Sequence, residues 1–377
     1  IVKEKKILIE GIRSLKKFIA KIFGKGEEAP VKTYADFWKW FAKHHKAFRK
    51  IVMEGEEIEE AFFSKIGPKL DSIKSGYWFM CGRYDESTVE LIITADSFVK
   101  NIVFAEELIA EAPQLPGWRF TALKPEHDAE NCRISMDNLS FNQDVLSFYP
   151  VEDPQCPDEI NIVIVHKDYT DENVDDIIRG SYIFLEHYLG ELNSVTSIDS
   201  LDFKSPATAT AELIDIERLK SYLVWREKEF VEKYEGVYHD DYEDGISVLE
   251  AELEDGSMAI ATINTKLLDW EGKVAYPWML RVTIAYDPKG SMPDPETSTH
   301  LNEFEDRLIE KLKHTDGCLW LGHETSRGER DIYFACKEFR KVSKILWHEE
   351  QEFQHNYEFT FDIFKDKYWR TLQHFAQ

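Results

Sequence analysis

The chain has 377 residues, a hydrophobic content of 43% and a formal net charge of −25 at pH 7. This length suits two domains with an accessory segment, and the apolar content is sufficient to bury a core in each. The excess of acid argues against nucleic-acid binding, which needs basic patches for the phosphates. It favours solubility of the chain, or a partner protein with a basic surface, and we give solubility the greater weight.

The first 25 residues reverse the acidic trend, with eight Lys or Arg against two acids. Their apolar side chains recur at helical spacing, so residues 3–23 are predicted to form a basic amphipathic helix. This helix can dock on the acidic body of the chain, join two copies of it, or lie on an anionic membrane surface. We favour the first two, and the third stays open.

Two aromatic, amphipathic helices are predicted next, over residues 34–53 and 56–75. Residues 1–75 are therefore expected to be an N-terminal helical segment. Residues 76–204 then alternate between strand and helix patterns and end at the small-residue stretch Ser205–Ala211. We predict a ferredoxin-like, split βαβ domain over residues 76–204 and a linker with one helix over residues 205–235.

Residues 236–377 are predicted to form a second domain of the same class. Its first part is acidic, with nine acids and no Lys or Arg over residues 235–256. Apolar and charged side chains alternate over residues 246–253, as expected of a half-exposed strand. From Trp278 to Phe364 the pattern reads strand, helix, strand, strand, helix, strand. The predicted fold class is thus α+β, with two ferredoxin-like antiparallel-sheet domains in tandem after N-terminal helices.

The chain has five cysteines, an odd number, and no two of them form a C-x-x-C pair. This pattern predicts reduced, buried thiols in a cytoplasmic protein rather than a disulfide framework. No apolar run reaches the ~18 residues of a membrane span. No nucleotide-binding, hydrolase or kinase motif is present, so we expect no cofactor and name no catalytic residue.

Several short motifs after residue 242 resemble an uncharacterised bacterial family, domain of unknown function 695. Among them are Ser247–Ala251, Ile263–Thr265, Tyr276–Trp278, Leu301–Asp306 and the stretch from Gly322 to Arg330. A segment with Glu90–Asp96 and Gly117–Trp118 resembles the region that accompanies this domain in related bacterial proteins. The resemblance implies a fold and a cytoplasmic bacterial setting, and it implies no activity.

The polar stretch from Glu324 to Arg330 is the candidate binding site. Arg327 and Arg330 flank a glycine in a predicted strand-to-strand turn, where two guanidinium groups can grip a carboxylate or phosphate. The acids of the neighbouring helix can instead neutralise these arginines. The candidate site residues are His323, Arg327 and Arg330 together with Glu303 and Asp306.

Metal binding is not expected at the other polar clusters. The stretch from His348 to Glu352 resembles the zincin helix motif, but position 352 is Glu where a second His is required. The acids around His239 lack the spacing of a calcium loop. We therefore predict no metal site.

Three functions remain open at this point. The favoured one is a non-enzymatic, protein-binding or regulatory module that uses an exposed sheet face or the Arg327/Arg330 turn. The second is a hydrolase-like enzyme with a pocket between domains. The third is peripheral association with a membrane through the N-terminal basic helix.

Overall fold

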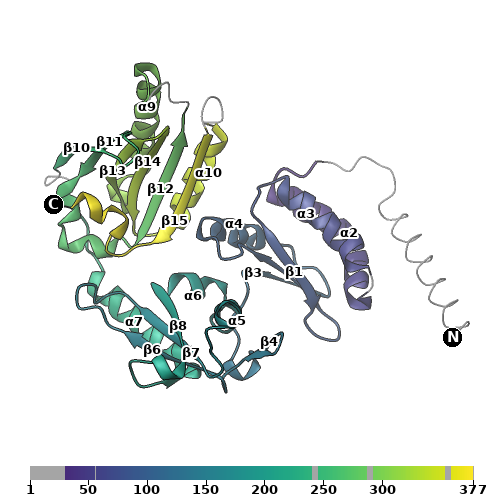
Figure 1. Ribbon diagram of the computed structural model, residues 1–377. Coiled ribbons are helices and arrows are strands. Elements are labelled where there is room, and N and C mark those ends of the chain that lie inside the picture. The colour runs from purple at the N-terminus through teal and green to yellow at the C-terminus, as the bar shows by residue number, and fades with distance from the viewer. Residues whose placement is uncertain (1–29, 56, 240–244, 287–291, 353–357, 377) are drawn as a thin grey trace, which may run out of the picture. The chain divides into compact units, whose positions relative to one another are not determined.

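The computed structural model describes residues 30–55, 57–239, 245–286, 292–352 and 358–376. The chain divides into two compact units, one ending at Pro125 and the other beginning at Glu126 (Figure 1). The predicted N-terminal basic helix lies outside the described residues. Its three possible contacts, with the body of the chain, with a second copy or with a membrane, therefore stay predictions. None of the described helices is both long enough and apolar enough to cross a membrane.

The first unit packs helices on one face of a three-stranded sheet with the order β1-β2-β3. Strand β2 is antiparallel to β1 and parallel to β3. The fully buried rings of Phe37, Phe41 and Phe48 lie on α2, whose N-cap residue Thr33 accepts a hydrogen bond from the Asp36 amide. The elements are α2 (Tyr34–Glu54), η1 (Glu59–Phe63), α3 (Ser64–Asp71), β1 (Trp78–Arg83), β2 (Val89–Thr94), α4 (Val99–Ala110) and β3 (Trp118–Ala122).

The second unit begins with a four-stranded sheet of order β8-β7-β6-β9. Strand β7, which is rich in the β-branched residues Ile and Val, lies between its two neighbours. It is antiparallel to β6 and parallel to β8. Its helices bury Phe184, Leu185 and Leu223 against the sheet. The elements are β4 (Ile134–Met136), β5 (Leu139–Phe141), β6 (Leu146–Val151), β7 (Asn161–His166), α5 (Val174–Leu189), α6 (Glu191–Thr196), β8 (Ser200–Lys204), β9 (Ile214–Asp215) and α7 (Leu219–Tyr234).

These two sheets differ from the single antiparallel sheet that we expected over residues 76–204. Strands β1 to β3 belong to the first unit, whereas β6 to β9 belong to the second. Each sheet also contains one parallel pair, because a helix crosses from β2 to β3 and helices cross from β7 to β8. A strand can be predicted from the pattern of nearby residues. Which strands pair with one another depends on residues far apart in the sequence.

A six-stranded, fully antiparallel sheet forms the rest of the second unit, with the order β10-β11-β13-β14-β12-β15. The expected sequence of strand, helix, strand, strand, helix, strand is present from β12 to β15. The α+β class is therefore confirmed. The elements are β10 (Ile246–Glu252), β11 (Met258–Asn264), α8 (Thr265–Leu268), η6 (Glu271–Ala275), β12 (Trp278–Ala285), α9 (Pro295–Lys311), β13 (Cys318–Ser326), β14 (Glu329–Cys336), α10 (Arg340–Glu352), β15 (Glu358–Lys365) and η8 (Arg370–Phe375).

Both faces of this sheet are partly covered. Helix α9 is capped by Asp294, whose carboxylate accepts a hydrogen bond from the Thr297 amide at 2.9 Å. On the opposite face Met279, Leu321 and Tyr333 form a cluster with Trp369 and Leu372 of the C-terminal segment. That segment ends in the short 3-10 turn η8.

The turn between β13 and β14 is also shorter than the predicted loop. The strands continue to Ser326 and resume at Glu329, so only Arg327 and Gly328 form the turn. Both have positive φ, of 50° and 84°, as the tight hairpin turns between twisted strands require.

Candidate functional site

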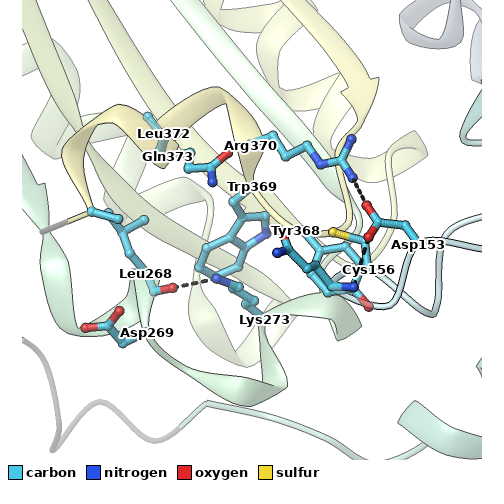
Figure 2. A pocket seen from close by; sticks show the side chains of 12 residues that line it. Asp153, Cys156, Leu268, Asp269, Lys273, Tyr368, Trp369, Arg370, Leu372 and Gln373 are labelled. Atoms are coloured by element: carbon cyan, nitrogen blue, oxygen red, sulfur yellow. Dashed lines mark hydrogen bonds and ion pairs between the residues drawn. The ribbon is translucent and has the colours of Figure 1, made fainter.

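A pocket of about 540 Å³ opens in the second unit beside the C-terminal segment (Figure 2). One wall is the loop after β6, which carries Asp153 and Cys156. The other wall is η8 with the residues before it, and α8 and η6 supply Leu268 and Lys273. A volume of this size is typical of sites for small ligands.

The loop places three potential ligand groups on one side. The Cys156 amide donates to the Asp153 carbonyl at 2.9 Å, and the Glu159 amide donates to the Cys156 carbonyl at 3.1 Å. Two successive four-residue turns therefore bring Asp153, Cys156 and Glu159, each three residues apart, to one side of the loop. The ligand atoms of Asp153, Cys156 and Glu159 lie within 4.8 Å of one another, a donor set that could hold a divalent cation.

Arg370 already supplies a positive charge to this group. Its Nη2 lies 2.8 Å from a carboxylate oxygen of Glu159 and 3.3 Å from one of Asp153. A hydrogen bond with Cys156, together with these two charges, raises the pKa of Arg370 although burial opposes this. Burial raises the pKa of Glu159, and Arg370 counteracts that shift. A metal ion would thus compete with a guanidinium for the same carboxylates.

Trp369 lies at the base of the pocket, among the side chains shown in Figure 2. It is 1% exposed, its backbone has a φ of 53°, and its indole Nε1 donates to the Tyr276 carbonyl at 3.1 Å. Lys273 reaches back to the Leu268 carbonyl at 2.6 Å. The indole N–H of Trp369 and the ammonium group of Lys273 therefore both donate to backbone carbonyls of the second unit.

Residues on both sides of the pocket are joined by a polar network. The Asp158 carboxylate accepts hydrogen bonds from Lys233 at 2.7 Å and from Tyr234 and Tyr368 at 2.8 Å. Burial alone would raise the pKa of Asp158, but these three donors outweigh burial and lower it. The segment after β15 is thus fixed to the loop after β6 and to helix α7.

The predicted site residues lie elsewhere, on the six-stranded sheet and α9. Glu305, 4% exposed, accepts hydrogen bonds from Trp320 at 2.7 Å and interacts with His323 at 2.9 Å. The Arg330 Nη1 lies 3.6 Å from Glu305. Burial lowers the pKa of Arg330, and the charge of Glu305 opposes this shift. His323 and Arg330 are therefore brought together by Glu305, the neutralising alternative that the sequence left open.

The other three predicted residues do not join this cluster. Arg327 pairs with Asp255 at 2.9 Å in the exposed turn between β10 and β11. Glu303 and Asp306 are exposed on α9. The pocket residues were not predicted, although the three-residue spacing of Asp153, Cys156 and Glu159 is a signal that could have drawn attention to them.

Comparison with known proteins identifies the C-terminal part alone. No curated protein and no solved structure matches the chain. The matched region begins at the last two residues of β10, includes the other five strands of the six-stranded sheet and ends after η8. Residues 251–376 match the family of unknown function DUF695, which confirms the resemblance drawn from the C-terminal motifs but not that of the segment with Glu90–Asp96 and Gly117–Trp118.

Proposed function

We propose that this protein is a protein-binding module that accepts a basic strand of its partner along the edge strand β10. The observation that carries the proposal is the orientation of the β10 backbone. The Thr265 amide donates to the Gly245 carbonyl, and the Leu253 amide donates to the Ser257 carbonyl. Between these two bonds, the odd-numbered residues of β10 pair with β11.

The even-numbered residues of β10 consequently direct their N–H and C=O groups away from β11. Strand β10 lies at the edge of the sheet, so no described strand pairs with these groups. The four residues are Ile246, Val248, Glu250 and Glu252. Such a row of groups is the template on which an extended peptide adds a strand.

The side chains of the same residues select the partner. Ile246 and Val248 are 62% and 66% exposed, and Glu250 and Glu252 are exposed beside them. A strand with apolar and basic side chains complements this surface. A second copy of β10 would bring carboxylates together, so self-pairing is disfavoured.

The opposite edge of the sheet has a different character. The Asp366 amide donates to the Pro277 carbonyl, so the outward residues of β15 are odd-numbered. Phe361 and Ile363 are among them, and both are buried. The residues whose backbone groups are directed away from the sheet thus have exposed side chains on β10, whereas Phe361 and Ile363 on β15 are buried.

The test uses a peptide of alternating lysine and valine, with a peptide of alternating glutamate and valine as its control. The lysine peptide is expected to protect the amides of Ile246, Val248, Glu250 and Glu252 from hydrogen exchange. The Glu250→Gln/Glu252→Gln variant should bind it about tenfold more weakly. The Glu296→Gln/Glu310→Gln variant removes the same charge from exposed positions of α9 and should bind it normally. Equal binding of both peptides, or no protection at β10, would overturn the proposal.

The ferredoxin-like assignment is retained for the C-terminal sheet. The order β13-β14-β12-β15, with α9 and α10 as the two connections, supports it. The hairpin of β10 and β11 then extends this unit on the β13 side. This added hairpin is what creates the proposed binding edge.

A second candidate function rests on the pocket. Cys156 lies beside two carboxylates and Arg370, and these groups could serve a hydrolase-like reaction with Cys156 as nucleophile. Alkylation by iodoacetamide tests this function. An activated Cys156 should react at least about tenfold faster than Cys132, which is also buried. Equal rates would remove the candidate.

A further inference from the structure

Two buried cysteines face each other in the six-stranded sheet. Cys318 opens β13 and Cys336 closes β14, and the register places them directly opposite one another. They are 5% and 0% exposed. A hydrogen bond joins the two thiols.

The backbone hydrogen bonds determine how close this pair lies. The Lys337 amide donates to the Gly317 carbonyl at 2.9 Å, so the next pair inward, Cys318 and Cys336, is not hydrogen-bonded. A second hydrogen bond gives the same result independently. Because the Tyr286 amide donates to the Gly328 carbonyl, the even-numbered residues of β14, including Cys336, direct their backbone groups at β12 and not at β13.

The spacing of such a pair permits a disulfide. Residues opposite each other at a non-hydrogen-bonded position have Cα atoms about 4.5 Å apart, with side chains on the same face. A disulfide spans Cα separations of roughly 4.4–6.8 Å. The two strands therefore need no large rearrangement to be bridged.

We propose that Cys318 and Cys336 are an oxidation site at which hydrogen peroxide forms a reversible cross-strand disulfide. One thiolate attacks the peroxide, which gives a sulfenic acid and hydroxide, and the thiol proton converts the hydroxide to water. The second thiol attacks the sulfenic sulfur, forms the S–S bond and releases a second water. Two cysteines are oxidised by two electrons in total, and one peroxide is reduced to two waters.

The first attack falls to Cys318. It is the more exposed of the two and follows Gly317, whose φ of 80° turns the chain into β13. The hydrogen bond with Cys318 and burial both raise the pKa of Cys336, so little of its thiolate is present at neutral pH. Burial also makes the reaction slower than that of an exposed thiol, and a small oxidant suits the site for that reason.

The remaining cysteines provide internal controls. Cys81 lies opposite Leu91 in the first sheet, and burial raises its pKa to about 12. Cys132 follows η2 (Ala129–Asn131), and Cys156 lies in the pocket loop. None of the three lies opposite a cysteine in a described strand pair.

The experiment treats the full chain with hydrogen peroxide and maps its peptides by mass spectrometry without reduction. The expected product is a crosslink of Cys318 to Cys336 that has lost two hydrogen atoms and is reversed by dithiothreitol. Because it forms in the unmutated chain, this result does not depend on the folding of a variant. In Cys336→Val, Cys318 should instead be trapped as a sulfenic acid by dimedone.

Two results would overturn the proposal. One is recovery of both thiols intact under conditions that oxidise Cys156. The other is further oxidation of Cys318 in the unmutated chain without any crosslink to Cys336.

Discussion

The ammonium group of Lys367 lies 2.8 Å from a carboxylate oxygen of Asp199, and Lys367 is only 2% exposed. The same carboxylate receives Lys365 at 3.2 Å and the Ile160 amide at 2.7 Å. Burial lowers the pKa of Lys365, and the charge of Asp199 opposes this. One acid with little exposure thus joins the end of β15 to the four-stranded sheet, next in sequence to Tyr368, Trp369 and Arg370 of the pocket.

Replacing Lys367 with Met should destabilise the second unit by about 3 kcal/mol, because a buried carboxylate loses one of its charged partners. Lys233→Met is the comparison, since Lys233 is 52% exposed in its pair with Asp158. That change should cost about 1 kcal/mol or less. Urea unfolding followed by Trp fluorescence measures both. Equal costs would show that burial of the Lys367 pair has no special weight.

Asp158 should make stability depend on pH in the acid range. Its folded pKa is lowered, so it contributes stability above the pKa of the unfolded chain and loses that contribution as pH falls through the folded value. In Asp158→Asn, stability at neutral pH should be lower and its decline below about pH 4 shallower. Urea midpoints across the acid range provide the measurement. A parallel decline in both proteins would contradict this role.

Truncation of Arg330 should cost much more stability than truncation of Arg327. Arg330 is 6% exposed, and it also donates to Thr325 at 3.0 Å and Asn302 at 2.7 Å. Arg330→Ala should cost about 3 kcal/mol because it leaves Glu305 buried with a partner removed. Arg327→Ala removes an exposed pair and should cost about 0.5 kcal/mol. Thermal unfolding separates the two, and a stable Arg330→Ala protein would argue against a structural role.

Gly322 should not tolerate a side chain. Its φ is 135°, and a Cβ there would lie 2.1 Å from the Thr262 carbonyl oxygen and 2.8 Å from the Ile263 Cα. Gly322→Ala should therefore destabilise the sheet by about 3 kcal/mol. Gly82→Ala is the matched strand control, because a Cβ at Gly82 meets nothing within 4 Å. Similar unfolding midpoints for both variants would refute the steric argument.

The sequence predicted most elements because their signals are local. Asp294 and Pro295 mark the start of α9, and β10 shows the alternation of a half-exposed strand. The turn at Arg327 was predicted too long because Thr325 and Arg330 are polar residues in buried strand positions. Such residues interrupt the apolar alternation and read as a loop.

The pocket could not be predicted for a different reason. Glu159 and Arg370 are 211 residues apart along the chain and 2.8 Å apart in space. No periodicity links such positions. The acids of the neighbouring helix, to which Glu305 belongs, were recognised as possible partners of the arginines because helical spacing is a local signal. Whether the Arg327 and Arg330 region also binds a ligand stays a prediction.

The left-handed backbone of Trp369 has a consequence for the order of folding. A left-handed conformation costs a non-glycine residue roughly 1–2 kcal/mol. Here the buried indole and its bond to the Tyr276 carbonyl offset that cost, and both require the sheet to exist first. The last residues of the chain should therefore close late in folding. Quenching or enhancement of the Trp369 emission would then report the final step of assembly.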